Sequence, residues 1–189
     1  MLNQVRERID PWITRLGLSA SNLGISANIW TYIGLVLALL SALAYSGIFF
    51  GGALLGGVLL LLSGFTDVVD GAVARVRGTV SKKGGFLDSI LDRMGEVFIF
   101  AGILVGGYVD PIIVMLAISF SILVSYVRAK AELHDIKIRG IGVGERAERI
   151  LVIAILSIVG VVWLGVVLVL ILAIVTFVQR ITYITGKLT

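Results

Sequence analysis

The distribution of apolar positions predicts a chain of membrane-spanning helices. Long apolar runs alternate with short polar stretches, and about 20 apolar residues suffice for a helix to cross the hydrocarbon core. Residues 1–18 mix charged and apolar side chains at a spacing typical of an amphipathic helix on a membrane surface, with no cleavable signal. We expect one all-α integral membrane domain over residues 1–189, with this juxtamembrane helix and six transmembrane helices, at 28–47, 51–74, 85–107, 111–130, 147–164 and 166–186.

Turn-forming residues separate these runs. Gly47, Gly51 and Gly52 lie between the first two, and Asp110-Pro111 lies between the third and the fourth. The fifth and sixth runs have only Gly165 between them, so we expect the last turn near that residue.

Composition supports a membrane protein. The chain is 58% hydrophobic with a mean hydropathy of +1.07, more apolar surface than a soluble domain of 189 residues needs. It contains no cysteine, which excludes disulfides and thiolate metal sites. We interpret the net charge of +4 first as a topology signal and expect no nucleic-acid partner.

Positive charge is confined to one side of the predicted bundle. All 16 Lys and Arg residues lie in the N-terminal segment, in 75–93, in 128–149, or at Arg180 and Lys187. With six spans, these regions share one face of the membrane, and the opposite turns carry only Asp110. The positive-inside rule then predicts a multi-pass protein of the cell membrane with both termini and the charged loops in the cytoplasm.

Two pairs of aspartates lie at neighbouring cytoplasmic ends of the second and third runs. Asp67 and Asp70 are three residues apart, and Asp88 and Asp92 are four apart, so each pair lies on one helical face. Acidic residues within or beside a span are costly and usually functional. The loop between the pairs is short, so the carboxylates should converge at one site.

Clustered carboxylates need a counter-charge. Hard divalent cations prefer such all-oxygen sites, so we expect Mg²⁺ or Mn²⁺, two per site, a pair suited to displacement at phosphorus. The alternative is a structural role in ion pairs with Arg75, Arg77 and Arg93. A transporter or a scaffold is disfavoured, because a transporter's acids would lie near the midplane on interrupted helices and a scaffold needs none.

The residues around the aspartates suit a nucleotide. Gly71, Ala74 and Gly84 present little side chain, which lets a nucleotide approach the backbone, and Arg75 can pair with a phosphate. The alternative for Gly84 is a helix-packing spacer.

The spacing Asp-x2-Asp-Gly-x2-Ala-Arg-x8-Gly-x3-Asp-x3-Asp, from Asp67 to Asp92, resembles the signature of the CDP-alcohol phosphotransferase family without a mismatch. The resemblance implies a cytoplasm-facing site, two metals, CMP as leaving group and a homodimer. It implies that Asp67, Asp70 and Asp88 bind metal and that Asp92 both binds metal and acts as base for the acceptor hydroxyl. It assigns Gly71, Ala74, Arg75 and Gly84, with Asp67 and Asp70, to the CDP-lipid.

Many family members carry Pro-Asn-x-x-Thr before the first span, and here the segment reads Ala27-Asn28-Ile29-Trp30-Thr31. The proline is absent, but Asn28 and Thr31 are retained and are candidates for contacts with the nucleotide. The alternatives are a helix cap for Asn28 and a packed hydroxyl for Thr31.

A narrower resemblance concerns the acceptor. The segments 125–132 and 144–149 look like the branch that uses inositol 1-phosphate, whose products are phosphatidylinositol phosphate or archaetidylinositol phosphate. A phosphorylated acceptor needs fixed positive charge, and one-turn spacing puts Ser125 with Arg128 and Arg146 with Arg149 on helical faces. Lys130 and the basic stretch 137–139 would add to this pocket. The alternatives are ordinary positive-inside charge and, for the acceptor, glycerol 3-phosphate or less readily serine.

Two further polar residues receive structural interpretations. His134, the single histidine, lies in a polar loop and is expected to be solvated. Glu96, one turn beyond Asp92, is expected to be buried and paired with an arginine or a backbone donor. The family resemblance implies a CDP-lipid donor, either CDP-archaeol or CDP-diacylglycerol.

Overall fold

The computed structural model of the chain describes residues 2–48, 51–138 and 140–188, with side chains from residue 11 onward. Every regular element in these ranges is an α-helix. The elements are α1 (Leu2–Asn22), α2 (Ala27–Tyr45), α3 (Gly52–Val76), α4 (Lys82–Val105), α5 (Pro111–Leu133), α6 (Arg146–Ile158) and α7 (Val162–Leu188). The expected amphipathic helix is present as α1, although the side chains of its first nine residues lie outside the described part.

Four helices are long and apolar enough to cross a membrane: α2, α3, α5 and α7. Helix α4 has 24 residues but includes Asp88, Asp92 and several other charged residues, and α6 has only 13 residues. At about 1.5 Å per residue, α6 is near 20 Å long, short of the roughly 30 Å hydrocarbon core. The chain is therefore an α-helical membrane protein, and six complete spans remain a prediction.

The last helix boundary was predicted at the wrong glycine. Helix α6 ends at Ile158, and the turn contains Gly160 with φ of 85°, a left-handed conformation that favours glycine. Gly165 instead lies inside α7, where a Cβ would come 3.3 Å from Ile153 Cα. Gly165 thus serves the close packing of α7 on α6, and hydropathy alone did not distinguish a packing glycine from a turn glycine.

Side-chain caps determine where several helices begin. The Ser26 hydroxyl accepts a hydrogen bond from Ile29 N, and the Ser81 hydroxyl accepts one from Gly84 N. Asp110 caps α5 with Pro111 as its first residue. Glu145 and Glu148 form a capping box at the start of α6.

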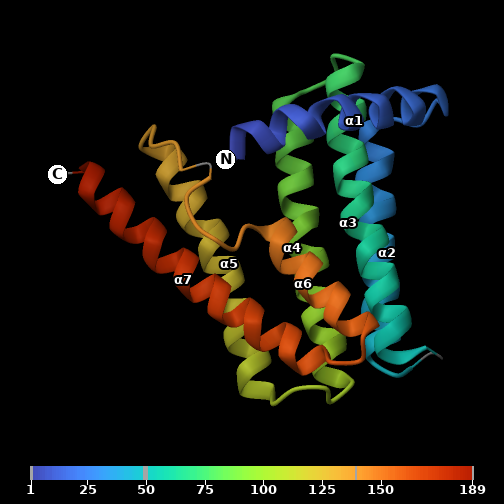
Figure 1. Cartoon of the computed structure of the whole chain (residues 1–189), viewed down its shortest axis with the longest axis vertical. Helices are drawn as coiled ribbons and strands as arrows, with labels where there is room; N and C mark the ends of the chain where they lie inside the picture. Colours follow the sequence, from blue (N-terminus) through green and yellow to red (C-terminus); the bar gives the residue numbers. More distant parts are fainter. Residues whose placement is uncertain (1, 49–50, 139, 189) are drawn as a thin grey trace.

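The helices form a bundle crossed at one end by α1. Helix α2 packs on α3 and α4, α6 packs on α3 and α7, and α5 packs on α7 (Figure 1). Helix α1 lies across the end of the bundle and approaches α3 at Gly17, where a Cβ would lie 2.8 Å from Ala72 O. The apolar core includes Leu60, Ile103 and Val166.

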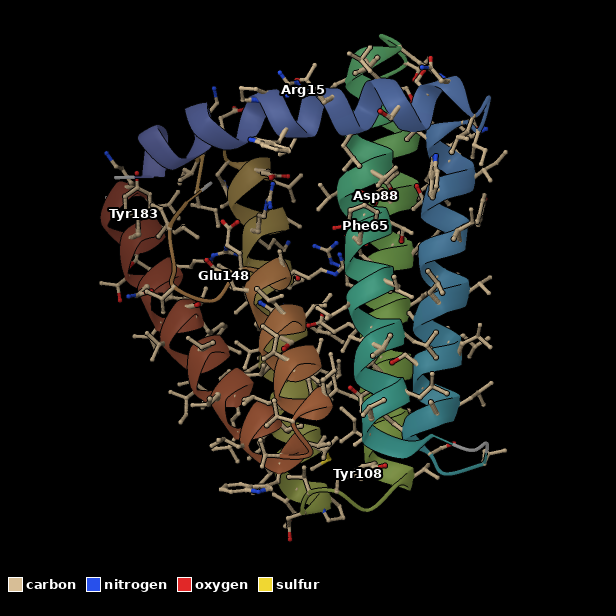
Figure 2. All side chains as sticks on the ribbon, turned by 45° about the vertical axis from the view of Figure 1, so that its right-hand side comes forward. Arg15, Phe65, Asp88, Tyr108, Glu148 and Tyr183 are labelled. Carbon is tan, nitrogen blue, oxygen red and sulfur yellow. The ribbon has the colours of Figure 1, made fainter. Side chains whose placement is uncertain are left out.

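The polar segments gather at the end that α1 covers. The C-terminus, the segment between α3 and α4 and the segment between α5 and α6 all lie toward this end (Figure 1). Figure 2 shows Asp88 in this half of the bundle and Tyr108 at the opposite end. The charged loops therefore share one end, as the distribution of Lys and Arg predicts, and the site lies in that half.

Candidate active site

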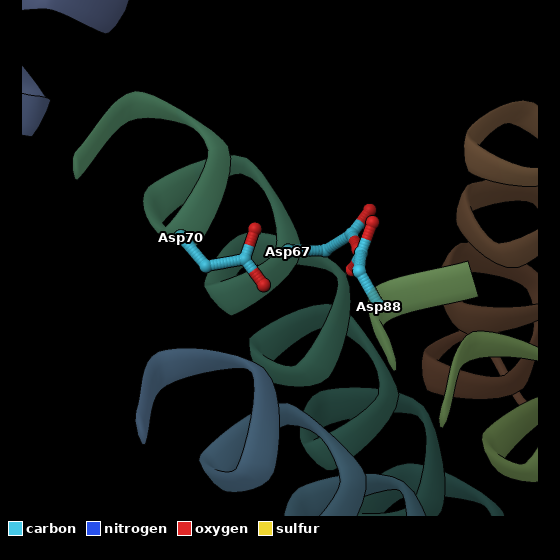
Figure 3. A group of neighbouring side chains, drawn as sticks. All are labelled: Asp67, Asp70 and Asp88. Carbon is cyan, nitrogen blue, oxygen red and sulfur yellow. The ribbon is translucent and has the colours of Figure 1, made fainter. Parts of the chain in front are cut away.

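Three of the predicted aspartates form one cluster between α3 and α4. Asp67, Asp70 and Asp88 each place a carboxylate oxygen within 4.8 Å of the others (Figure 3). The helical spacing puts the first two on one face of α3, and the short connection between α3 and α4 brings Asp88 opposite them. The sequence prediction that carboxylates from these two helices converge is confirmed for these three residues.

The donor set of this cluster fits a divalent metal ion. Asp88 Oδ1 is buried and has no hydrogen-bond partner among the described residues, so a carboxylate oxygen remains available as a ligand. The Thr31 hydroxyl donates to Asp70 Oδ2 at 2.8 Å, which orients that carboxylate. Three closely spaced carboxylates repel one another, and a hard cation with oxygen ligands relieves that repulsion.

Asp92 lies next to this cluster and contacts an arginine. Its Oδ1 is 2.9 Å from Arg146 Nη1, and its Oδ2 is 3.5 Å from Arg93 Nη1. The same Arg146 nitrogen is 3.3 Å from Asp67 Oδ2. Arg146, from the first turn of α6, therefore joins a residue of the aspartate cluster to the predicted base.

A groove on one side of the cluster has the features expected for a nucleotide site. It has a volume of about 460 Å³ and lies among α2, α3 and the start of α4. Gly71, Ala74 and Gly84 keep it open, and Arg75 brings a positive charge to its wall. All the residues predicted to contact the CDP-lipid line it except Asp67: Asn28, Thr31, Asp70, Gly71, Ala74, Arg75 and Gly84.

The structure distinguishes between the two interpretations of Asn28. Ser26 is the N-cap of α2, so Asn28 is not the capping residue, and its exposed side chain lies along the groove. Asn28 Oδ1 would be 3.7 Å from a Cβ on Gly84, which places α2 and α4 on facing walls.

A second cavity, of about 560 Å³, lies on the other side of the cluster among α4, α5, α6 and α7. The proposed acceptor residues all line it: Ser125, Arg128, Arg146 and Arg149. Asp67, Asp88 and Asp92 line it as well. The predicted phosphate pocket and the carboxylates thus share one cavity.

The basic residues of this cavity differ in how accessible they are. Arg128 is exposed and pairs with Glu132 at 3.1 Å on its own helix. The Arg149 side chain is only 1% exposed and pairs with Glu96 at 3.0 Å. Lys130 and Lys137, which were expected to add to this pocket, do not line the cavity. Lys130 Nζ lies 5.9 Å from the ring centroid of Tyr126, and Arg139 lies outside the described residues.

Sequence reasoning missed Arg180 of α7. Its side chain is buried and donates to Ile141 O at 2.9 Å and to Val124 O at 3.0 Å, so it ties the segment before α6 to α5 and α7. It also lines the second cavity. The available signal was an arginine inside an otherwise apolar run.

Two structural interpretations from the sequence are confirmed. Glu96 is buried and paired with an arginine, and His134 is exposed at the end of α5.

The aspartate cluster forms a wall between the two cavities. Asp70 and Asp88 line the nucleotide-sized groove, whereas Asp67 and Asp88 line the basic cavity. A ligand in either cavity therefore reaches Asp88 and one further carboxylate of the cluster. A helical membrane bundle with this arrangement has the geometry of an enzyme that transfers a phosphate-linked group between two substrates.

The sequence matches the model of the CDP-alcohol phosphatidyltransferase family over residues 24–182. The chain belongs to this family and is a transferase. The matched region contains all seven residues that line the groove from the predicted donor set and all four predicted acceptor residues.

Curated relatives extend over nearly the whole chain. The archaetidylinositol phosphate synthase of Pyrococcus horikoshii is 40% identical over 181 residues, covering 96% of this chain and 95% of the relative. That of Methanothermobacter thermautotrophicus is 42% identical over 164 residues, 85% of this chain and 78% of the relative.

A solved structure has the same fold. The crystal structure of the phosphatidylinositol phosphate synthase of Mycobacterium tuberculosis with CDP-DAG bound has a TM-score of 0.76 and 23% identity, covering 91% of this chain and 92% of that one. The same enzyme has been solved in complex with manganese and citrate, also with a TM-score of 0.76.

Proposed function

We propose that this protein transfers the phospholipid moiety of a CDP-lipid to inositol 1-phosphate, with release of CMP. The observation that carries the proposal is the position of the aspartate cluster between a nucleotide-sized groove and a basic cavity. The product is a lipid-linked inositol phosphate, as the names of the relatives from Pyrococcus and Methanothermobacter suggest.

The groove is the donor site in this proposal. The cytidine diphosphate lies over Gly71, Ala74 and Gly84, where the absence of large side chains lets it approach the helices, and Arg75 contacts a phosphate. The lipid chains stay in the bilayer. CDP-archaeol and CDP-diacylglycerol share this headgroup.

The basic cavity is the acceptor site. Arg128 from α5 and Arg146 from α6 contribute positive charge, and Ser125 contributes a hydroxyl. A phosphate dianion is recognised by such charge-assisted hydrogen bonds. Serine carries no phosphate for these arginines to bind.

The transfer takes place at the aspartate cluster, between the donor site and the acceptor site. Asp67, Asp70 and Asp88 would hold divalent metal, Mg²⁺ or Mn²⁺, whose positive charge would stabilise the negative charge that develops during the transfer. Asp92 lines the acceptor cavity and accepts the proton of the acceptor hydroxyl. The hydroxyl oxygen forms a bond to the phosphorus nearer the lipid, and the bond from that phosphorus to the CMP oxygen breaks.

The enzyme works as a homodimer with its active site facing the cytoplasm.

A panel of acceptors tests the proposal. CMP release is measured in detergent with CDP-archaeol and with CDP-diacylglycerol, each with inositol 1-phosphate, glycerol 3-phosphate, serine or free inositol, in Mg²⁺ or Mn²⁺ and with chelator. We expect inositol 1-phosphate to react fastest and free inositol to be poor. A faster reaction with glycerol 3-phosphate would reassign the acceptor and leave the transferase assignment in place.

The role of Arg128 gives a second test of the acceptor site. Arg128→Ala should raise the KM for inositol 1-phosphate roughly ten- to a hundredfold, since a hydrogen bond to a charged group contributes about 1.5–3 kcal/mol. The KM for the CDP-lipid should change little, because Arg128 does not line the groove. Lys137→Ala, which removes an exposed cation from the loop after α5, is the matched control. An unchanged acceptor KM in Arg128→Ala would remove this residue from the site.

A further inference from the structure

A second ion pair joins α4 and α6 one turn farther into the bundle than Asp92 and Arg146. Glu96 Oε1 is 3.0 Å from Arg149 Nη2, and the two side chains are only 3% and 1% exposed. Separating two charges at this depth would leave each without solvation, so the two side chains stay together and fix the relative position of the two helices at this point.

Arg149 also contacts main-chain carbonyl groups. Its Nη1 donates to Gly144 O at 2.8 Å, and its Nη2 is 3.5 Å from Ser121 O. One guanidinium thus connects α4, α5 and the segment that leads into α6. These contacts occupy Nη1 and Nη2 and leave only Nε without a partner among the described residues, which disfavours Arg149 as the main ligand of the acceptor phosphate.

The two ion pairs are in register along both helices. Asp92 and Glu96 are four residues apart on α4, and Arg146 and Arg149 are three apart on α6, so each set lies on one face. Helix α6 packs on α3 and α7, whereas α4 packs mainly on α2 and α5. Long side chains therefore bridge α4 and α6 beside the acceptor cavity.

We propose that Glu96 and Arg149 are a positioning pair for the transfer reaction. Arg146 is the first residue of α6, and its place depends on where that helix begins. The hydrogen bond from Arg149 to Gly144 O, with Arg149 held by Glu96, acts together with the capping box of Glu145 and Glu148 to fix this start. Arg146 is thereby held 2.9 Å from Asp92 and 3.3 Å from Asp67, facing the acceptor. This inference rests on the proposed function and assigns a role to Glu96, a residue that does not line the acceptor cavity.

A double variant separates positioning from simple stability. In Glu96→Leu/Arg149→Met, apolar side chains of similar size replace the pair, and such replacements of buried ion pairs are often neutral or stabilising. The variant also leaves Gly144 O without its donor, so we expect a moderately lower apparent Tm in detergent, and the kinetics are measured well below it. Under these conditions kcat/KM for the acceptor should fall roughly ten- to a hundredfold, because a small misplacement of a catalytic group has an effect of that size. The KM for the CDP-lipid should stay within about twofold of the unmodified protein, since neither residue lines the groove.

A combination with Arg146→Ala tests whether the pair acts through Arg146. If it does, the triple variant has nearly the same acceptor kcat/KM as Arg146→Ala alone, because groups that act as one unit are not additive. Additive losses would overturn the proposal in favour of a direct phosphate contact by Arg149. Normal acceptor kinetics in the double variant would overturn it in favour of a purely structural pair.

Ser41→Ala is the control for a buried polar contact elsewhere. The Ser41 hydroxyl donates to Gly56 O at 2.7 Å between α2 and α3, away from both cavities, so this variant should lower the Tm and leave the kinetics unchanged.

The acceptor used is whichever reacts best in the panel, so a different acceptor does not affect the test. Absence of CMP release from the unmodified protein with every acceptor would instead contradict the proposed function itself.

Discussion

The clustered aspartates differ in the neighbours that each one contacts. Asp70 accepts a hydrogen bond from Thr31, Asp67 pairs with Arg146, and Asp88 keeps a buried oxygen without a partner among the described residues. The three carboxylates therefore have different neighbours, although their oxygens lie close together. Loss of any one changes both the ligand set and the charge of the cluster.

Replacing any of these ligands should stop the reaction. Asp67→Asn, Asp70→Asn and Asp88→Asn should each reduce CMP release to background while the protein still inserts, because the amide has a similar shape but no charge to hold a cation. Release is measured in detergent, and Mn²⁺ binding is followed by electron paramagnetic resonance.

Asp110→Asn provides the same chemical change at the opposite end of the bundle. Asp110 caps α5, and asparagine caps helices equally well, so this variant should keep full activity. Near-normal rates in any of the three cluster variants would contradict the shared metal site.

Asp92→Asn should affect the chemical step more than donor binding. Asp92 lines the acceptor cavity but not the groove, and loss of a general base lowers rates by about 10²–10⁴-fold. Steady-state kinetics with varied CDP-lipid should show a reduced kcat with a nearly unchanged KM. A change confined to the KM for the CDP-lipid would mean that Asp92 is not the base.

At the scale of elements, glycines allow helices α1, α2, α3 and α4 to approach one another closely. A Cβ on Gly102 of α4 would collide with the Ala42 carbonyl of α2, and one on Gly17 of α1 would meet Ala72 of α3. Close approach through small residues is a common basis of helix packing in lipid. These contacts set the positions of α2, α3 and α4, which carry the groove and the cluster.

Gly102→Ala should destabilise the bundle. The added methyl group has no space at the α2–α4 contact, and overpacking of this kind costs about 1–3 kcal/mol. We expect a lower apparent Tm in a detergent unfolding assay. Gly186→Ala in the last turn of α7, where a Cβ meets nothing within 4 Å, should leave the Tm unchanged or slightly higher. Equal stabilities of the two variants would show that this contact does not limit packing.

At the scale of the whole molecule, the polar segments and the site lie in one half of the bundle. The loop after α3 and the loop after α5 share the end covered by α1, and the turns after α2 and α4 lie at the other end (Figure 1). A membrane placed across the apolar middle puts the active site near one surface. The positive-inside rule predicts that this surface is cytoplasmic.

Single cysteines test that orientation, because the natural chain has none. Ile48→Cys should react with an impermeant thiol reagent applied outside intact cells, and Val80→Cys and Lys137→Cys should react only after the cells are opened. All three positions are exposed, so burial does not prevent labelling, as it would at Ile138. The reverse labelling pattern would place the active site on the outside.

The sequence by itself determined the features that depend on local periodicity. Helical spacing puts Asp67 with Asp70 on one face, and a short connection to α4 brings Asp88 to them, so the cluster follows from residues close in the chain. The same reasoning located the four long apolar helices and the grouping of positive charge. It misplaced the turn between α6 and α7, because hydropathy varies little across that apolar stretch and Gly160 and Gly165 look alike.

Tertiary structure alone decided the contacts between distant segments. Arg146 reaches Asp67 from 79 residues away, and Arg180 reaches Val124 from 56 residues away. Such contacts depend on the way α6 and α7 pack against the rest of the bundle, which no spacing rule specifies. Helical spacing puts Arg146 and Arg149 on one face of a helix and does not distinguish their roles. Both line the acceptor cavity, but packing places Arg146 beside Asp67 and Asp92 and buries Arg149 against Glu96, whose carboxylate compensates the buried charge.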